Sequence, residues 1–385
     1  MGSSDLVLDF HSYFQTDFTL LRYFGVWIVN QNETQGKVHG VYIFVINILF
    51  MLVLNLAQVI NFFKQTESLR KFAGCGYVVA ICCMASAKSY YLAKNRRAFQ
   101  ILVDTLNDKI FQPKTSQQKC IAENSLRFYR TIKTVLLATC SMAVISSMTT
   151  PLLVKKNDEN LPFASWYPFN VTSSPVHEVV YIHQCISCIY ISYINIYADI
   201  MISGFTTFIG LQCDMLCDEM ATMADCRKIE YSVGEFVEYH RHILRFAKKT
   251  EEVFSEIYFL QFIASTSCLC MTLFLLSVVE RNTFEFFYLI EFLASMFNLL
   301  LVPCWFSSEM KRKSENIPLA IYSCPWMDAS ESVKKEIIYF MHRTQQPIRF
   351  KAIGFFNISV ETFTSIVRSS FSYYAVLNNL NMKDD

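Results

Sequence analysis

The sequence predicts an all-α membrane protein with seven transmembrane helices, and three observations lead to this fold class. Of its 385 residues, 53% are hydrophobic and 17% are charged, which is too apolar for one soluble domain of this size. Seven apolar runs are each long enough to cross about 30 Å of hydrocarbon as a helix. Lys and Arg are concentrated in alternate loops, as expected when those loops stay in the cytoplasm.

The seven predicted spans follow one another along the chain. They cover residues 41–63, 72–93, 134–154, 180–211, 257–279, 284–306 and 350–377. The first span contains no charged residue. Residues 1–10 lack a basic start followed by an apolar block, so the sequence predicts no cleavable signal peptide and retains the N-terminal segment in the mature protein.

The loop charges predict the orientation of the chain. With the N-terminus inside, the inner segments hold 24 Lys and Arg and the outer segments hold 7. This bias places the N-terminus in the cytoplasm and the C-terminus outside, the reverse of a G-protein-coupled receptor. Asn170 begins a glycosylation acceptor pattern in the predicted outer loop after span three. Two further such patterns begin at Asn32, in the predicted cytoplasmic N-terminal segment, and at Asn357, inside predicted span seven.

The inner loop before span seven is predicted to form an amphipathic helix below the membrane. We expect Asp328 to cap this helix, with Glu331 at its third helical position as in a capping box, and Pro347 to end it. Apolar residues recur every four positions on one of its faces: Val333, Ile337 and Met341.

The inner loop of residues 212–256 shows a similar helical pattern. Phe236, His240 and Ile243 lie near one face. Both loops are therefore expected to be helical extensions rather than disordered linkers. The alternative is a pair of solvated amphipathic loops that contact only lipid or each other.

Two stretches near the ends of the chain carry family motifs. The C-terminal stretch contains Ala320-Ile321-Tyr322 with Trp326, Met341-x-Arg343-x-Gln345-x-Pro347, Ser359-x-Glu361-x-Phe363 and Ser369-Ser370-Phe371-Ser372-Tyr373. The N-terminal stretch contains Leu21-Arg22 with Gly25-Val26-Trp27, and has Ile28 where a proline often follows the tryptophan. These stretches resemble the insect odorant receptors. Related gustatory receptors tend to end in Gln-Phe, where this chain has Asn379-Leu380.

The resemblance implies an odorant-gated, non-selective cation channel subunit in the plasma membrane of an olfactory sensory neuron dendrite or cilium. It also implies a heterotetramer with the odorant receptor co-receptor, whose subunits meet at a cytoplasmic anchor domain. The predicted regions are the N-terminal segment with helices 1 to 6 (1–306), the anchor segment (307–349), and the pore-lining helix with an extracellular tail (350–385). The alternatives are a gustatory-type channel and a transporter, for which the sequence shows no internal repeat.

Four of the charged residues inside predicted spans are candidates for a role there, because charge in a membrane is costly and usually faces protein or water. Glu361 and Arg368 in span seven are seven residues apart and share a helix face. They either face the pore or pair with a neighbouring helix. Lys88 and Asp199 both lie toward the inner side, where a pair between them would serve packing rather than function.

The outer part of span seven contains the predicted gate. Val376 and Leu380 are four residues apart, so they share one helix face. The resemblance places the gate at these positions, and an apolar ring of this kind closes a pore by excluding water. Asn379 adjoins the ring and offers an uncharged polar contact to permeant cations. Because the sequence predicts no charged ring beside this gate, we expect weak selectivity among cations.

A pocket for a small volatile odorant is predicted in the outer halves of spans two, three, four and six. Pockets of this kind are mostly apolar with a few polar groups. The candidate residues are Tyr77, Ile81, Ser146, Ser147, Thr150, Tyr190, Tyr193, Phe287, Tyr288 and Phe292. Trp166 and His177 in the outer loop are expected to cover the pocket. Ordinary helix packing is the alternative for each residue.

Other function classes find little support in the sequence. The net charge of +1 gives no basic field for binding nucleic acid. The chain has no Gly-rich phosphate loop, no His-Glu-x-x-His and no Gly-x-Ser-x-Gly, so no enzyme and no cofactor are predicted. Cys213, Cys217 and Cys226 lack zinc-site spacing and a fourth ligand. We therefore expect a receptor that works in the lipid bilayer without a metal.

Overall fold

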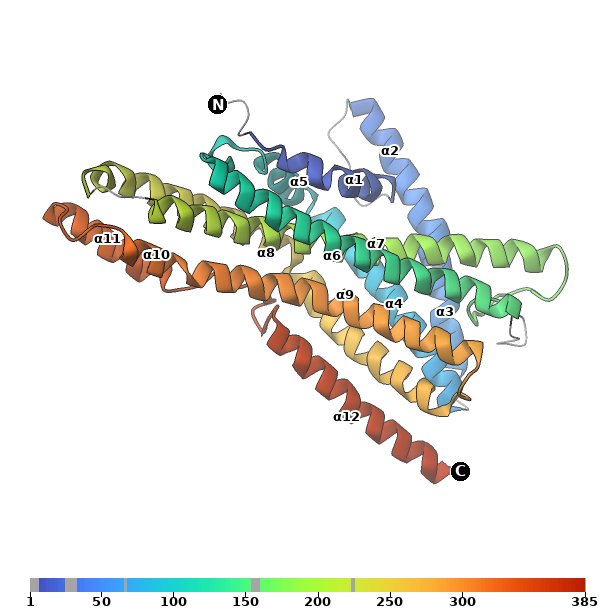
Figure 1. Ribbon diagram of the computed structural model, residues 1–385. Helices are drawn as coiled ribbons and strands as arrows, with labels where there is room; N and C mark the ends of the chain where they lie inside the picture. Colours follow the sequence, from blue (N-terminus) through green and yellow to red (C-terminus); the bar gives the residue numbers. More distant parts are fainter. Residues whose placement is uncertain (1–6, 25–32, 66–67, 154–159, 223–225, 385) are drawn as a thin grey trace.

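The computed structural model is built almost entirely of helices (Figure 1). It describes residues 7–24, 33–65, 68–153, 160–222 and 226–384. The helices are α1 (Phe10–Tyr23), α2 (Glu33–Ile46), a π-helical turn η2 (Asn47–Leu52), α3 (Val53–Lys64), α4 (Leu69–Lys94), α5 (Arg96–Thr105), η3 (Lys109–Phe111), α6 (Ser116–Leu153), α7 (Val176–Ala221), α8 (Cys226–Val278), α9 (Phe284–Glu315), α10 (Ile317–Ser323), α11 (Glu331–Thr344) and α12 (Val360–Asp384). A two-stranded hairpin, β1 (Lys351–Ala352) with β2 (Phe356–Asn357), precedes α12.

Six helical segments of the described chain are long and apolar enough to cross a bilayer. They are Gly40–Lys64, Leu69–Lys94, Ser116–Leu153, Val176–Ala221, Ser232–Val278 and Phe284–Ser323, and they match the first six predicted spans. The seventh, α12, is less apolar because it carries Glu361, Arg368 and several Ser and Asn residues. A helix that lines water on one side needs an apolar surface only on the other.

Several helices continue well beyond the membrane. The 46 residues of α7 and the 53 residues of α8 correspond to lengths of about 70 and 80 Å, against about 30 Å of hydrocarbon. Their inner parts pack with α10 and α11 (Figure 1). Between these helices lie Met220, Val233, Phe236, Ile321, Cys324, Ile337 and Phe340. The predicted helical extensions are thus present and form one packed cluster.

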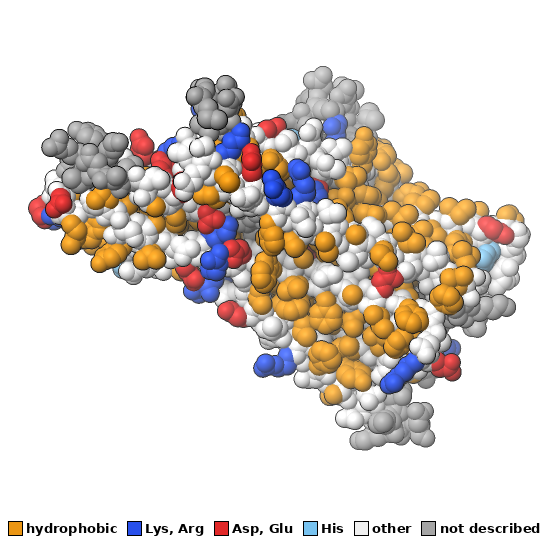
Figure 2. Space-filling view, in the orientation of Figure 1, with side chains coloured by type: hydrophobic (Ala, Val, Ile, Leu, Met, Phe, Trp, Pro, Cys, Tyr) orange, Lys and Arg blue, Asp and Glu red, His pale blue; other side chains and the backbone are white. Residues whose placement is uncertain are grey.

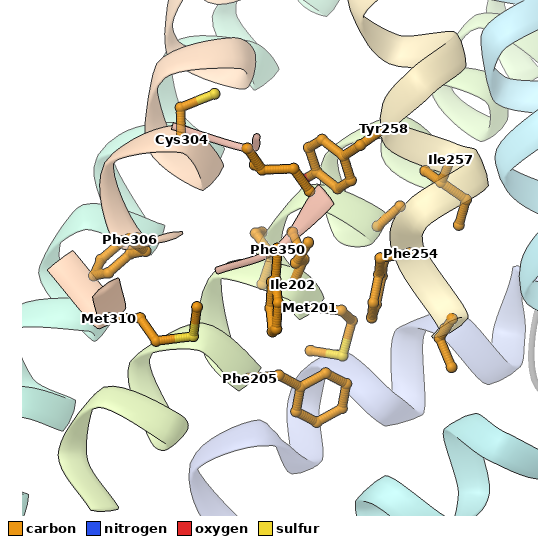
Figure 3. Packing of buried hydrophobic residues seen from close by; sticks show 14 of the residues in the cluster. Met201, Ile202, Phe205, Phe254, Ile257, Tyr258, Cys304, Phe306, Met310 and Phe350 are labelled. Carbon is orange, nitrogen blue, oxygen red and sulfur yellow. The ribbon is translucent and has the colours of Figure 1, made fainter. Parts of the chain in front are cut away.

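The core is centred on α7, whose side chains are buried on every side over most of its middle. A helix that is apolar all round belongs inside a bundle. Figure 3 shows Met201, Ile202 and Phe205 of α7 facing Phe254 of α8, with Phe350 among them. The first helix, α1, lies against α7 and places Phe14 against Phe205, with ring centroids 6.4 Å apart.

The surface divides into two regions that match a membrane orientation. Figure 2 shows hydrophobic side chains over the bundle and charged side chains gathered over the helical extensions. The first span alone exposes Val41, Phe44, Val45, Leu49, Leu52 and Leu56. Such a broad apolar surface is unusual for a soluble monomer and fits contact with lipid.

The start of span seven differs from the prediction. The run from residue 350 is not continuous helix, because the hairpin occupies its first part and α12 begins at Val360. Ile353 and Gly354 adopt positive φ values of 48° and 73° in the turn, a conformation that ends regular helix. Asn357 therefore lies exposed on β2 rather than within the span.

The hairpin is held by polar side chains from the two helices beside it. Ser255 of α8 donates its hydroxyl to the Lys351 carbonyl at 2.9 Å and accepts from the Ile353 amide at 2.7 Å. Ser308 of α9 accepts from the Val360 amide at 3.0 Å. The link between the anchor segment and α12 is therefore fixed to α8 and α9.

The cap predicted for the amphipathic helix was wrong. The helix α11 has Ser330 rather than Asp328 as its N-cap, and it ends at Thr344. The chain turns just before it, where the Ala329 amide donates to the Trp326 carbonyl at 3.1 Å.

The predicted region boundary between residues 306 and 307 falls inside the continuous helix α9. Residues 25–28 of the N-terminal motif lie outside the described part of the chain.

Candidate functional site

A cavity of about 90 Å³ lies between α3, α4, α6, α7 and α9, toward the predicted outer side. Its lining is mostly apolar, with a few polar groups, as ligand sites commonly are. The lining residues are Leu54, Tyr77, Val78, Ile81, Cys82, Cys140, Ala143, Val144, Ser147, Phe163, Cys188, Ile191, Ser192, Asn195, Ile196, Tyr288, Phe292, Ser295, Met296 and Leu299. We call this space the main cavity.

Five of the ten predicted pocket residues line the main cavity. They are Tyr77, Ile81, Ser147, Tyr288 and Phe292. The aromatic members form one group, in which the Tyr77 ring lies 5.0 Å from Phe292 and its hydroxyl lies 3.3 Å from that of Tyr288. The structure thus gathers residues from α4 and α9 into one aromatic wall.

The other five predicted residues lie elsewhere. The hydroxyl of Ser146 donates to Glu291 at 2.6 Å, and that of Thr150 donates to the Ser146 carbonyl at 2.6 Å. Tyr190 donates to the Phe24 carbonyl at 2.8 Å, and Tyr193 pairs with Ser141 at 2.9 Å. Phe287 is 57% exposed on the outside of α9. The spacing of residues in the sequence could not show how each helix is rotated about its axis, and therefore which of its side chains face the cavity.

The outer loop contributes Phe163 to the main cavity, a residue that the sequence analysis missed. Gln184 of α7 fixes it by accepting from its amide at 3.0 Å and donating to its carbonyl at 3.1 Å. The loop residues expected to cover the pocket do not line it. Trp166 instead lies beneath the Lys64 ammonium, 4.3 Å from the ring centroid, and the His177 ring lies 6.3 Å from that of Tyr181.

A buried ion pair lies on the inner side of the main cavity. The Lys88 ammonium lies 2.9 and 3.0 Å from the two Asp199 carboxylate oxygens, and both side chains are almost fully buried. Tyr258 of α8 donates to the same carboxylate at 3.1 Å. Lys88 also donates to the Asn195 carbonyl at 3.1 Å. The predicted pairing is confirmed, and it ties α4, α7 and α8 together.

The helix α12 has two distinct faces. One face packs against the bundle through Phe363, Ile366, Ser370, Tyr374 and Leu377. The opposite face is exposed along its length and carries Glu361, Ser365, Arg368, Ser372, Val376 and Asn379. Both sets recur at intervals of three or four residues, which defines opposite sides of one helix. We call the exposed set the open stripe of α12.

The two intramembrane charges of span seven belong to this open stripe. Among the described residues, neither Glu361 nor Arg368 forms an ion pair. Val376 is 56% exposed on the same stripe. Leu380 belongs to α12, but its side chain lies outside the described part of the structure.

Asn170 lies exposed in the outer loop between α6 and α7. Its side-chain oxygen accepts from the amide and the hydroxyl of Thr172, at 3.0 and 2.7 Å. The acceptor pattern thus lies on an accessible turn. Within the described part of the chain, no group of three or more His, Cys, Asp or Glu residues could hold a metal ion. The side chain of Cys226 is not among the described ones.

Comparison with known proteins places this arrangement. The family described as 7tm odorant receptor matches residues 69–371. The chain is 23% identical to Odorant receptor 10 of Aedes albopictus, covering 79% of this chain and 83% of that receptor. It is 22% identical to Odorant receptor 46a, isoform A, of Drosophila melanogaster, covering 87% and 88% of the two chains.

The fold is similar to that of a solved receptor. The olfactory receptor OR5 from Machilis hrabei, in complex with eugenol, superposes with a TM-score of 0.84 at 18% identity, covering 97% of this chain and 99% of that one. At this identity the likeness concerns the fold alone. The family match spans most of the chain and favours the odorant over the gustatory alternative. This chain therefore belongs to the insect odorant receptor family, a family of multi-pass membrane proteins of olfaction.

Proposed function

We propose that this chain is the odorant-binding subunit of an odorant-gated, non-selective cation channel. It assembles in the plasma membrane as a heterotetramer with the odorant receptor co-receptor. The observation that carries this proposal is the open stripe of α12. A membrane helix with one packed face and one face of charged, hydroxyl and amide side chains is suited to line water rather than lipid.

The order of residues along the open stripe supports its assignment as a pore lining. Glu361 and Arg368 lie toward the predicted cytoplasmic end, and Val376 lies toward the outer end. Repeated around a symmetry axis, Val376 with Leu380 forms an apolar constriction that closes by excluding water. Asn379 borders this ring with an uncharged amide. The ring carries no fixed charge, so discrimination among cations is weak.

The main cavity is the proposed odorant site. Tyr77, Tyr288 and Phe292 offer flat apolar surfaces that hold small volatile molecules by dispersion and stacking. The solved receptor of similar fold was determined with eugenol, a small aromatic compound of the kind that such a wall would accommodate.

Helix α9 connects the main cavity with α12, which also rests on α8. On α9, Met296 and Leu299 line the cavity. Phe297, which lies between them in the sequence, packs against Phe363 of α12 with ring centroids 6.2 Å apart. On α8, the Thr266 carbonyl accepts from Ser370 of α12 at 3.4 Å. A ligand that shifts α9 therefore shifts a surface on which α12 rests.

The anchor segment is the proposed site of subunit assembly. It exposes a group of large apolar side chains on α10, α11 and the turn between them: Leu319, Tyr322, Met327, Ile338 and Tyr339. This part of the chain lies beyond the membrane, so lipid does not cover these side chains. Exposed apolar groups of this kind mark protein interfaces.

The test is an accessibility experiment on currents evoked by odorants in cells that express this chain with the co-receptor. Ser365→Cys and Ser372→Cys on the open stripe are compared with Ile366→Cys and Ser370→Cys on the packed face. We expect a charged, water-soluble thiol reagent to alter the current only in the stripe variants. The wild-type chain, which has the exposed thiols of Cys83 and Cys120, sets the background. Equal modification of both faces would refute the pore assignment.

The gate is tested by two adjacent residues. Val376→Ala shortens the side chains of the apolar ring, which widens the constriction, and is expected to raise the current recorded without odorant. Leu377→Ala removes a neighbouring side chain that packs on the bundle and is the matched control for lost packing. A resting current that rises equally in both variants, at equal surface expression, would contradict a gate at Val376.

A further inference from the structure

The main cavity adjoins a second, smaller cavity on its inner side. The inner cavity measures about 20 Å³ and shares Ile81, Asn195, Met296 and Leu299 with the main cavity. It is closed by Gln261 of α8 and by Lys88 of α4. A space of about 10 to 15 Å³ accepts one water-sized group, so the inner cavity has room for a single small polar group.

Two amide oxygens at this place have no hydrogen-bond partner among the described residues. They are Oδ1 of Asn195 and Oε1 of Gln261. The two side chains are only 6% and 5% exposed. Their amide nitrogens are engaged, since Asn195 donates to the Ile81 carbonyl at 3.4 Å and Gln261 donates to the Ser265 hydroxyl at 3.4 Å. Buried acceptors without a donor cost free energy, so this site favours a group that brings a donor.

The nearest charged donor, the Lys88 ammonium, already uses its N–H groups in other hydrogen bonds. The Lys88 ammonium carries three N–H groups, and it has three acceptors in the two Asp199 oxygens and the Asn195 carbonyl. The hydroxyl of Tyr258 also donates to Asp199. The donor for the two amide oxygens must therefore come from something that enters the cavity.

The serine hydroxyls in the wall of the main cavity are poor donors to a ligand, because they already donate to backbone carbonyls. Ser147 donates to the Val144 carbonyl at 2.7 Å, and Ser295 donates to the Glu291 carbonyl at 3.0 Å. Both serine hydroxyls thus already have carbonyl acceptors within the protein, and Ser295 also lies 3.2 Å from the Thr139 carbonyl of α6. The unsatisfied acceptors lie at the inner end of a mostly apolar space.

We infer that Asn195 and Gln261 form a hydroxyl-binding subsite, so that the receptor prefers alcohols or phenols whose apolar body fills the main cavity. This inference rests on the proposed odorant site. A hydroxyl can donate its one proton to one of the two amide oxygens and accept from the second N–H of an amide nitrogen. Esters, ketones and hydrocarbons bring no donor and leave both oxygens unsatisfied.

The test measures binding to the purified receptor complex by ligand-induced thermal stabilisation. The probes are isosteric pairs that differ by hydroxyl against methyl: 2-phenylethanol with propylbenzene, benzyl alcohol with ethylbenzene, and 1-hexanol with heptane. We expect the wild-type protein to prefer the alcohols by about tenfold. Gln261→Met and Asn195→Leu should each reduce that preference to about threefold or less. Ser267→Ala is the control and should leave it unchanged, because Ser267 of α8 lines neither cavity and its hydroxyl donates to the Ile263 carbonyl at 3.2 Å.

The outcomes separate this subsite from the channel function. The wild-type comparison needs no variant, and its failure in all three pairs overturns the subsite. If the preference for alcohols persists in both amide variants, the subsite is also overturned, and the inner cavity then holds only water. Odorant-evoked currents without alcohol preference refute only the subsite. Alcohol preference without currents supports the subsite and refutes the channel.

Discussion

The buried Lys88–Asp199 pair allows a quantitative prediction for Lys88→Met. Methionine has a similar length but no charge, so the variant removes the ammonium and leaves the Asp199 carboxylate in the bundle. Asp199 then retains the hydrogen bond from Tyr258 and loses both contacts with Lys88. The Asn195 carbonyl also loses its lysine donor.

The expected cost follows from the burial of both groups. The two side chains are 1% and 0% exposed, and breaking such a pair from one side typically costs about 3 to 5 kcal/mol, because an uncompensated charge remains. Replacing both partners removes that charge. The double variant Lys88→Met, Asp199→Leu should therefore lose only about 1 to 3 kcal/mol, the cost of leaving the Tyr258 hydroxyl without its acceptor.

The assay is unfolding of the purified complex by detergent titration in mixed micelles, which reports the free energy of unfolding. Lys94→Met is the matched control on the same helix. Its ion pair with Glu256 is 49% and 35% exposed, and such pairs contribute about 1 kcal/mol or less. A cost of less than about 1 kcal/mol for Lys88→Met, or a double variant as unstable as both single variants combined, would refute the reasoning.

Three further predictions concern the hairpin and the outer loop. Phe350→Ala should cost about 3 to 5 kcal/mol in unfolding free energy, because the Phe350 side chain is only 2% exposed. Phe355→Ala should cost about 0.5 kcal/mol, because the Phe355 side chain is 76% exposed. Equal costs for the two variants would contradict this packing. Ile353→Gly should raise the free energy of unfolding by about 1 kcal/mol by relieving a positive φ of 48° in a β-branched residue, and Ile353→Val, which keeps the branch, should leave it unchanged. Asn170→Gln should abolish a glycosidase-sensitive shift in gel mobility while Asn357→Gln preserves it; the reverse pattern would overturn the predicted orientation.

Much of the helical architecture could be predicted from the sequence. Hydrophobic runs located the first six spans, and the periodicity of Phe236, His240 and Ile243 correctly indicated a helix in the long inner loop. That periodicity succeeded because a packed helix face repeats in the sequence itself. The three side chains are indeed largely buried on α8.

The hairpin could not be predicted from apolar content. Residues 350–359 are as apolar as a membrane helix start, but they turn back because the Ser255 and Glu251 side chains capture their backbone. Those partners lie about a hundred residues earlier in the chain. The local signal was Gly354 at a positive φ, followed by Ser359, whose hydroxyl accepts from the Thr362 amide at 3.3 Å at the start of α12.

The composition of the main cavity was only partly predictable for a related reason. Aromatic content suggested Tyr77, Tyr288 and Phe292, which line it, but also Phe287, which is exposed. Phe287 and Tyr288 are adjacent in sequence and point in different directions on α9. Nothing in their residue types distinguishes a lipid-facing ring from a cavity-facing one. Asn195, which has the unsatisfied amide oxygen, gave no sequence signal.

The shared use of α9 has a consequence for how odorant receptors of this kind diversify. One helix supplies Met296 to the cavity, Phe297 to the contact with α12 and Ser308 to the first amide of α12. If the main cavity binds odorant and α12 lines the pore, as proposed, a substitution on α9 that changes odorant preference is expected to change the current recorded without odorant as well. New odorant preferences acquired on this helix would then come with a changed resting signal.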